Sequence, residues 1–509
     1  MACLCGLTAF SAATRHEFQP VEKFAGLKSA PGRSAILEIG VSGSFDSFQG
    51  AFMAKKAAKA RATKPAQVEP SGFETALNNY FGISESGSSI RTEIIAGITT
   101  FLTMAYIIVV NPQILAKAGM PQGSVFVATC LAAAVATAVM GLYARYPIAL
   151  APGMGLNAFF AFTIVLTYKY TWQQALWAVF LSGVLFFLVS VFRIREYIID
   201  AIPMNLKLAI SAGVGLFLAI IALENAGVVV DHPATLVTLG KLDPRLAASW
   251  PALLAILGFI LIAALNYRNI PGATIIGMFI VSAIGIPFGL MTYGGIVSMP
   301  PSIAPTLFQF DWSRTFELTF IIVVLTLFLI DVFDNAGTLI GVTHRSGLLD
   351  KKGRLPRMKQ ALISDSFAAM FGSAVGTSTT TSYIESSAGV AAGGRTGLTA
   401  VVVSILFLLA LFFSPLAASI PAYASAAALL FVAAIMMRGL AEMNWDDVTD
   451  YAPAVVCAIA MPLTYSIATG IGLGFITYVL IKLLAGKEED VTPALVVLAI
   501  LFALKFAFT

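Results

Sequence analysis

Apolar segments long enough to cross a bilayer recur from about Glu93 to the C-terminus, and no other feature restricts the fold of this chain as strongly. Each segment has 16–22 residues, close to the roughly 20 residues that a helix needs to span hydrocarbon. Composition agrees, because 58% of the 509 residues are hydrophobic and only 11% are charged, against about 25% in soluble domains. The chain is therefore predicted to be an all-α polytopic membrane protein, and a soluble enzyme with a very apolar core is disfavoured.

Basic residues indicate the number of spans and their orientation. Connectors after even-numbered spans are rich in Lys and Arg, and the stretch from Arg345 to Lys359 alone holds six. Because basic loops stay on the cytoplasmic side, the pattern predicts about fourteen spans with both ends of the bundle inside. Pro493–Phe508 is a short apolar stretch that contains Lys505, and we favour an interfacial helix there over a fifteenth crossing. The spans are expected near residues 93–110, 123–142, 147–166, 172–192, 205–223, 250–266, 272–290, 317–336, 359–375, 378–395, 397–413, 421–437, 453–468 and 470–485.

Two of these spans, the third and the tenth, are broken. The segments Pro147–Phe160 and Gly376–Gly389 each open with residues that disfavour helix, such as Ala151-Pro152 and a Thr-rich run, and then turn into a short helix. Broken spans in matching positions of two halves indicate the binding site of a secondary transporter. We expect two inverted seven-span repeats, with short strands that cross-pair and half-helices whose N-terminal N–H groups face a cavity.

Acidic side chains within the spans are the strongest chemical signal. Asp331 and Asp334 lie three residues apart on one helical face of span 8, and Glu385 opens the second half-helix. A carboxylate at mid-bilayer costs about 2.5–3.5 kcal/mol on insertion scales, so three of them indicate function. The alternatives are a structural polar pair for the aspartates and an N-cap for Glu385.

Asn157 occupies the place in the first half-helix that Glu385 occupies in the second, and Phe159 follows it. A buried amide could instead hold the break together, and Phe159 could simply pack in the core.

The spans contain no nucleophile–base or metal set, and the four cysteines show no metal spacing. We therefore expect no catalytic residues, no metal and no cofactor. Glu224-Asn225 ends span 5 and is expected near the membrane interface.

Four long motifs occur together in this order. They are Ala96-Gly-Ile-Thr-Thr-Phe-Leu-Thr-Met-Ala-Tyr-Ile-Ile-Val-Val-Asn-Pro112, Ala149-Leu-Ala-Pro-Gly-Met-Gly-Leu-Asn-Ala-Phe159, Asp331-Val-Phe-Asp-Asn-Ala-Gly-Thr338 and Thr381-Ser-Tyr-Ile-Glu-Ser-Ser-Ala-Gly-Val390. The chain resembles the AzgA-like adenine/guanine/hypoxanthine permeases over roughly residues 73–509. That group is related to the nucleobase–ascorbate and uracil permeases.

The resemblance implies a purine nucleobase importer of the cell membrane that is driven by proton symport, moves like an elevator and forms a possible homodimer. It implies substrate binding by Asp334 and Glu385, with Asn157, Phe159, Thr338 and Ser386 completing the expected set. Thr338 stands where relatives carry a histidine, so Asp331, Asp334 and Glu385 are the candidate proton carriers. Nucleic acid is not an expected partner.

A purine edge presents N–H donors and N or O acceptors, so carboxylates and half-helix amides suit it. Transport of uracil, xanthine or an anion by the same fold is the alternative, although acids at the site disfavour an anion. The order of preference among purines stays open.

The expected organisation divides the chain into several regions. Residues 1–72 form a disordered or non-native extension, in which Met53 is a possible alternative start, and residues 73–92 form an interfacial segment. The transporter region covers 93–485, with a core (93–192 and 317–413) and a gate (205–290 and 421–485), followed by an apolar tail at 486–509.

Overall fold

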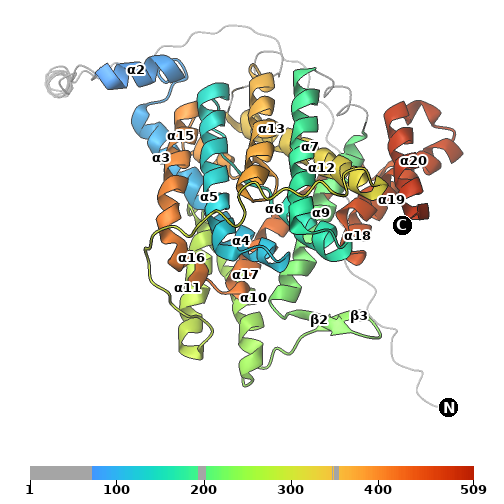
Figure 1. Ribbon diagram of the computed structural model, residues 1–509, viewed down its shortest axis with the longest axis horizontal. Helices are drawn as coiled ribbons and strands as arrows, with labels where there is room; N and C mark the ends of the chain where they lie inside the picture. Colours follow the sequence, from blue (N-terminus) through green and yellow to red (C-terminus); the bar gives the residue numbers. More distant parts are fainter. Residues whose placement is uncertain (1–71, 193–201, 347, 349–354, 509) are drawn as a thin grey trace, which may run out of the picture. The chain divides into compact units, whose positions relative to one another are not determined.

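The computed structural model describes residues 72–192, 202–346, 348 and 355–508, and within them the chain is mostly helical (Figure 1). Nine helices in this described part are long and apolar enough to cross a membrane. The prediction of a helical membrane protein is confirmed, while the count of fourteen spans stays a prediction. The nine are Ile90–Lys117, Gln122–Ala144, Trp172–Val191, Met204–Asn225, Ala247–Tyr267, Leu318–Asn335, Gly397–Ser419, Ala422–Glu442 and Ile467–Leu484. Shorter apolar helices cover Met154–Thr167, Ala273–Phe288, Val448–Leu463 and Pro493–Ala507.

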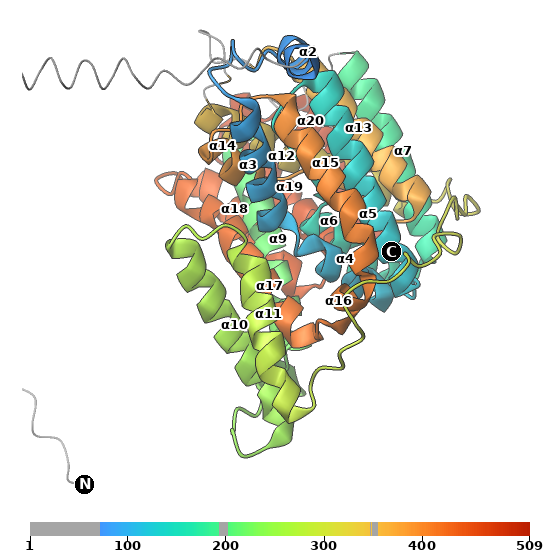
Figure 2. The ribbon, with the colours of Figure 1, turned by 90° about the vertical axis from the view of Figure 1, so that its left-hand side faces the viewer.

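Most of the long helices pack in two groups. The first group contains α3 (Ile90–Met104), α4 (Ile107–Lys117), α5 (Gln122–Val139), α7 (Trp172–Val191), α12 (Leu318–Ser346), α13 (Met358–Val375), α14 (Ser386–Ala391) and α15 (Gly397–Ala410). The second group contains α9 (Met204–Asn225), α10 (Trp250–Tyr267), α11 (Ala273–Gly285), α17 (Ala422–Met436), α18 (Val448–Leu463) and α19 (Ile467–Leu484). Figure 2 shows α10 and α11 side by side, with α17 packed against them.

The two broken segments meet inside the first group. Strand β1 (Leu150–Pro152) pairs antiparallel with β4 (Thr380–Ser382), so that Ala151 lies opposite Thr381. The predicted cross-pairing of the two breaks is therefore confirmed. Each strand leads into a short helix, α6 (Met154–Ala158) after β1 and α14 after β4, and α6 continues as a π-helix over Phe159–Thr167. Every residue of both strands is buried, as backbone outside a helix requires at membrane depth.

Two features mark the ends of the helix bundle. Helix α2 (Gly72–Phe81), which covers the first part of the expected interfacial segment 73–92, lies at one end. A hairpin of β2 (Val229–His232) and β3 (Leu236–Leu239) lies at the other end, in the connector after α9 (Figure 1). We call these the α2 end and the hairpin end. The hairpin was not predicted, because its alternation of side chains is short and lies in a polar connector.

A long connector without regular structure, residues 289–317, crosses the hairpin end of the first group. Its backbone is fastened there, since Ser302 O accepts from Ser124 Oγ at 2.8 Å and Phe308 N donates to Ala374 O at 2.7 Å. Gly376, at the end of α13, has φ +97°, and a Cβ there would come within 2.3 Å of Thr306. Only glycine fits this close crossing.

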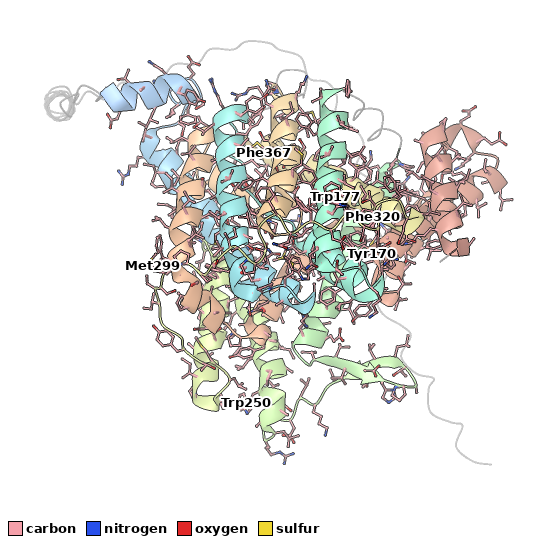
Figure 3. The ribbon with its side chains drawn as sticks, viewed as in Figure 1. Tyr170, Trp177, Trp250, Met299, Phe320 and Phe367 are labelled. Atoms are coloured by element: carbon pink, nitrogen blue, oxygen red, sulfur yellow. The ribbon has the colours of Figure 1, made fainter. Side chains whose placement is uncertain are left out.

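The start of α12 is held by aromatic and polar contacts that fix the helix carrying Asp331 and Asp334. The rings of Tyr170 and Phe320 pack edge to face with centroids 5.7 Å apart (Figure 3). The Tyr170 hydroxyl also donates to Glu317 Oε2 at 3.1 Å. Edge-to-face pairs of this kind add about 0.5–1.5 kcal/mol beyond the burial of their area.

The C-terminal segment, Pro493–Phe508, forms α20, which packs on α19 and contacts α12.

Candidate functional site

Helix α12 places two of the predicted acids beside the crossed strands. It packs against β4 and against both half-helices, α6 and α14. Asp331 is only 1% exposed, whereas Asp334, one turn further on, is partly exposed. Asp334 and Glu385 are close enough for their charges to interact. The structure therefore brings together the two acids that the sequence singled out most strongly.

Glu385 stands at the N-cap position of α14, but its side chain makes no capping hydrogen bond. Instead its Oε1 accepts from the hydroxyl of Tyr106 at 2.6 Å. The capping alternative is thus not the arrangement observed. Glu385 as a residue is partly exposed, and a hydrogen bond from a buried hydroxyl holds its carboxylate. Hydrogen bonds to a charged group are among the stronger ones, at about 1.5–3 kcal/mol net.

Tyr106 is a site residue that sequence reasoning missed. Span 1 was predicted as one helix, but the structure interrupts it between α3 and α4, and Tyr106 lies at that interruption, 2% exposed. A polar aromatic residue followed by Asn111-Pro112 within an apolar span was the available signal. Tyr383 is the other tyrosine of the cluster, since it lies near Glu385 and Asp334. Its hydroxyl donates to Pro152 O at 2.5 Å.

Asn157 and Ser386 are used within the protein. Asn157 is fully buried; its Nδ2 donates to Pro152 O at 3.5 Å, and its Oδ1 accepts from the Ser378 hydroxyl. The Ser386 hydroxyl accepts from Ala149 N at 3.0 Å. These bonds join the first broken segment to the second, which is what the structural alternative for Asn157 describes. Phe159 is fully buried and Thr338 is 7% exposed.

Two further buried acids support the site without having been predicted. Asp365 on α13 accepts from the Ser382 hydroxyl at 2.9 and 3.1 Å and so fixes the end of β4. Glu93 on α3 accepts from Thr396 N at 3.2 Å and from the Thr399 hydroxyl at 2.5 Å. Glu93 thereby fixes Thr396, the N-cap residue of α15, to α3. Sequence reasoning missed both, because their partners are more than ten residues away along the chain.

Three hydroxyls along the second broken segment are buried and have no hydrogen-bond partner in the described part of the chain. They belong to Thr379, Thr380 and Thr381. Buried polar groups usually have a partner in the protein or in ordered water, so this strand carries spare hydrogen-bonding capacity next to the acids. Across the described residues, no cluster of His, Cys, Asp and Glu is suited to a metal ion.

Comparison with known families identifies relatives of this chain. Residues 91–473 match the Permease family, Xan_ur_permease. "Adenine permease AdeP" of Escherichia coli is 48% identical over 432 residues, which cover 85% of this chain and 96% of that protein. "Guanine/hypoxanthine permease PbuG" of Bacillus subtilis is 45% identical over 445 residues, which cover 85% of this chain and all of that protein.

Solved structures show the same fold at low identity. The transmembrane domain of the cyanobacterial bicarbonate transporter BicA superposes with a TM-score of 0.55 at 14% identity, over 75% of this chain and 96% of that one. SLC26A9 gives a TM-score of 0.57 at 12% identity, over 89% of this chain and 73% of that one. The resemblance to purine permeases that the motifs indicated is confirmed, and the chain is a membrane transport protein that belongs to the Permease family represented by Xan_ur_permease.

Proposed function

We propose that this permease imports purine nucleobases, namely hypoxanthine, guanine or adenine, by proton symport. The observation that carries the proposal is the 45–48% identity, over about 85% of the chain, to permeases named for adenine and for guanine/hypoxanthine. The site chemistry supports it, because Asp334 and Glu385 lie near each other beside two half-helices, as in secondary transporters whose sites lie at broken spans.

In this proposal the two acids bind the purine nucleobase. Asp334 and the accessible part of Glu385 accept hydrogen bonds from purine N–H groups, and half-helix amides serve the ring acceptors. Tyr106 is a positioning residue, because its hydroxyl holds Oε1 of Glu385 and so fixes the direction in which the carboxylate faces. Asn157 and Ser386 hold the strand crossing in place. Contact of Phe159 and Thr338 with the base is part of the same proposal.

Proton coupling is assigned to Asp331, Asp334 and Glu385 as candidates. A neutral purine gains nothing from the membrane potential, so its accumulation requires a coupled ion. A buried carboxylate changes its proton affinity when its hydration and neighbouring charges change. We propose that this happens as the site turns from one side of the membrane to the other, with no cofactor beyond the proton gradient.

The proposed movement is an elevator-like displacement of a core (93–192 and 317–413) against a gate (205–290 and 421–485). Each of two inverted seven-span repeats contributes spans to both the core and the gate. The packing of the helices in two groups supports this division. We place the protein in the cell membrane with a cytoplasmic N-terminus, so that the α2 end faces the cytoplasm and the hairpin end faces outward. Assembly as a homodimer is part of the proposal.

Uptake of radiolabelled hypoxanthine and adenine tests this function directly. The protein is expressed in cells that lack their own purine permeases, and each substrate is competed with the other purines and with uracil. We expect saturable uptake that unlabelled purines inhibit and uracil does not, and that is lost in Glu385→Gln. Uracil or xanthine as the preferred substrate would support the alternative specificity, and no nucleobase uptake at normal membrane abundance would overturn the proposal.

A further inference from the structure

At the hairpin end, hydrogen bonds cross between the two helix groups. Lys117, the last residue of α4, donates to Asn225 Oδ1 at the end of α9. The Tyr168 hydroxyl bonds to Ser466 Oγ at 3.2 Å, and Thr163 Oγ1 donates to Tyr465 O at 3.4 Å. Gln113 Nε2 donates to Ile420 O, just before α17, at 2.9 Å. We call this set the seam, which comprises Gln113, Lys117, Thr163 and Tyr168 on one side and Asn225, Ile420, Tyr465 and Ser466 on the other.

The α2 end differs. There the hydrogen bonds between described residues stay within one group: Glu93 bonds to Thr396 and Thr399 within the first group, and Asn205 Nδ2 donates to Asn444 O at 2.9 Å beside the second. These crossing bonds between described residues thus lie at the hairpin end. Alternating access requires contacts that close one side of the transporter while the site opens to the other.

The surroundings of the seam allow its hydrogen bonds to break. A cavity of about 610 Å³ lies against it, lined by Lys117, Glu224, Asn225 and Tyr465 together with Phe162 and Leu166. Lys117 is exposed, so water can replace its bond to Asn225 when the groups separate. The other three bonds of the seam are part-buried. Each hydrogen bond contributes modestly in net terms, so a set of four can hold a conformation and still separate. Glu224 also accepts from the Tyr465 hydroxyl at 2.5 Å, which orders the turn that carries Tyr465 and Ser466.

The C-terminal helix reinforces the same end. Lys505 on α20 is 3% exposed and donates to the Tyr168 hydroxyl at 2.5 Å, with its Nζ 4.5 Å from the centre of the Tyr168 ring. Tyr168 therefore connects the first group both to the turn before α19 and to α20, which packs on α19. A single side chain thus bonds both to the turn before α19 and to the helix that packs on α19.

We propose that the seam is the outer latch of the transporter: it holds the hairpin ends of the two groups together, and its rupture opens the site toward that side. The inference rests on the proposed function for the meaning of the two ends. The seam itself concerns only which residues close the boundary between the groups.

Hydrogen–deuterium exchange of the full chain in lipid nanodiscs tests the latch without a substrate. Lys117→Met removes the donor to Asn225 and keeps the apolar stem, and Tyr168→Phe removes the bonds to Ser466 and Lys505. Arg245→Gln is the matched control, because it breaks an exposed ion pair with Asp243 in the connector after the hairpin, which does not cross the boundary. One net hydrogen bond corresponds to about a two- to tenfold change in the opening equilibrium.

We expect Lys117→Met to raise exchange about two- to tenfold in peptides around residues 163–168, 222–228 and 463–468, and the double variant to raise it further. Peptides at the α2 end should remain unchanged. A rise confined to the peptide that carries the substitution, an equal rise at both ends, or the same rise in Arg245→Gln would overturn the latch. If the wild type shows no purine uptake but the exchange pattern is as expected, the proposed function is overturned and the latch is not.

Discussion

The two broken segments have the same construction but differ in what they offer. The first, β1 and α6, is entirely buried. The side chain of its polar residue Asn157 is hydrogen-bonded to Pro152 and Ser378. The second, β4 and α14, carries Glu385, which is partly exposed and held at one oxygen by Tyr106. One half of the crossing thus serves as a scaffold, while the other presents a charge. Ligand chemistry is therefore expected on the second segment and on α12 facing it.

The largest expected effect comes from the charged side of this comparison. Glu385→Gln and Asp334→Asn should each abolish purine uptake or reduce it more than tenfold, because each removes a negative charge at the place where the two acids meet. Uptake is measured alongside the amount of protein in the membrane. Near-normal transport with unchanged apparent affinity in both variants would contradict the site assignment.

Tyr106→Phe should have an intermediate effect. Loss of the hydrogen bond to Glu385 frees the carboxylate to turn, and a bond to a charged group is worth about 1.5–3 kcal/mol. We expect the apparent KM for purine to rise roughly tenfold while the protein reaches the membrane normally. Tyr423→Phe is the control, since it removes a buried hydroxyl that donates to Val281 O within the second group. Equal changes in both variants would point to packing rather than positioning.

Asn157→Ala tests the structural role of the first broken segment. Removing a buried amide from its partners should cost about 1–3 kcal/mol of stability and change the apparent KM of the surviving protein little. Thermal unfolding of the purified permease measures the first quantity, and uptake kinetics measure the second. Unchanged stability with a strongly raised KM would instead show that Asn157 contacts the substrate.

The smallest effect is expected outside both segments. Deleting residues 1–52 should leave uptake unchanged, because that stretch contains no apolar span and no family motif. These residues lie outside those that the structure describes, so only transport assays bear on them. Lost uptake at normal surface abundance would show that the extension has a role.

Much of the site could be predicted from the sequence because its signals are local. Pro152 and the Thr-rich run predicted strands, and the structure pairs them. Acids in apolar spans are costly enough to stand out, so Asp334 and Glu385 were found. Tyr106 and Asp365 were not, because a tyrosine in a span is common and the partner of each is set by tertiary packing. The interruption of span 1 at Tyr106 was missed for a similar reason, since Pro112, which the sequence shows, lies inside α4 rather than at the interruption.

We propose above that proton flow drives purine accumulation through this site. The purified permease is reconstituted in proteoliposomes, and accumulation of radiolabelled hypoxanthine and adenine is followed under an imposed proton gradient and then under a sodium gradient. We expect accumulation under the proton gradient alone and its collapse with a protonophore. We expect no accumulation in Glu385→Gln. Accumulation driven only by sodium, or by neither gradient, would contradict proton symport.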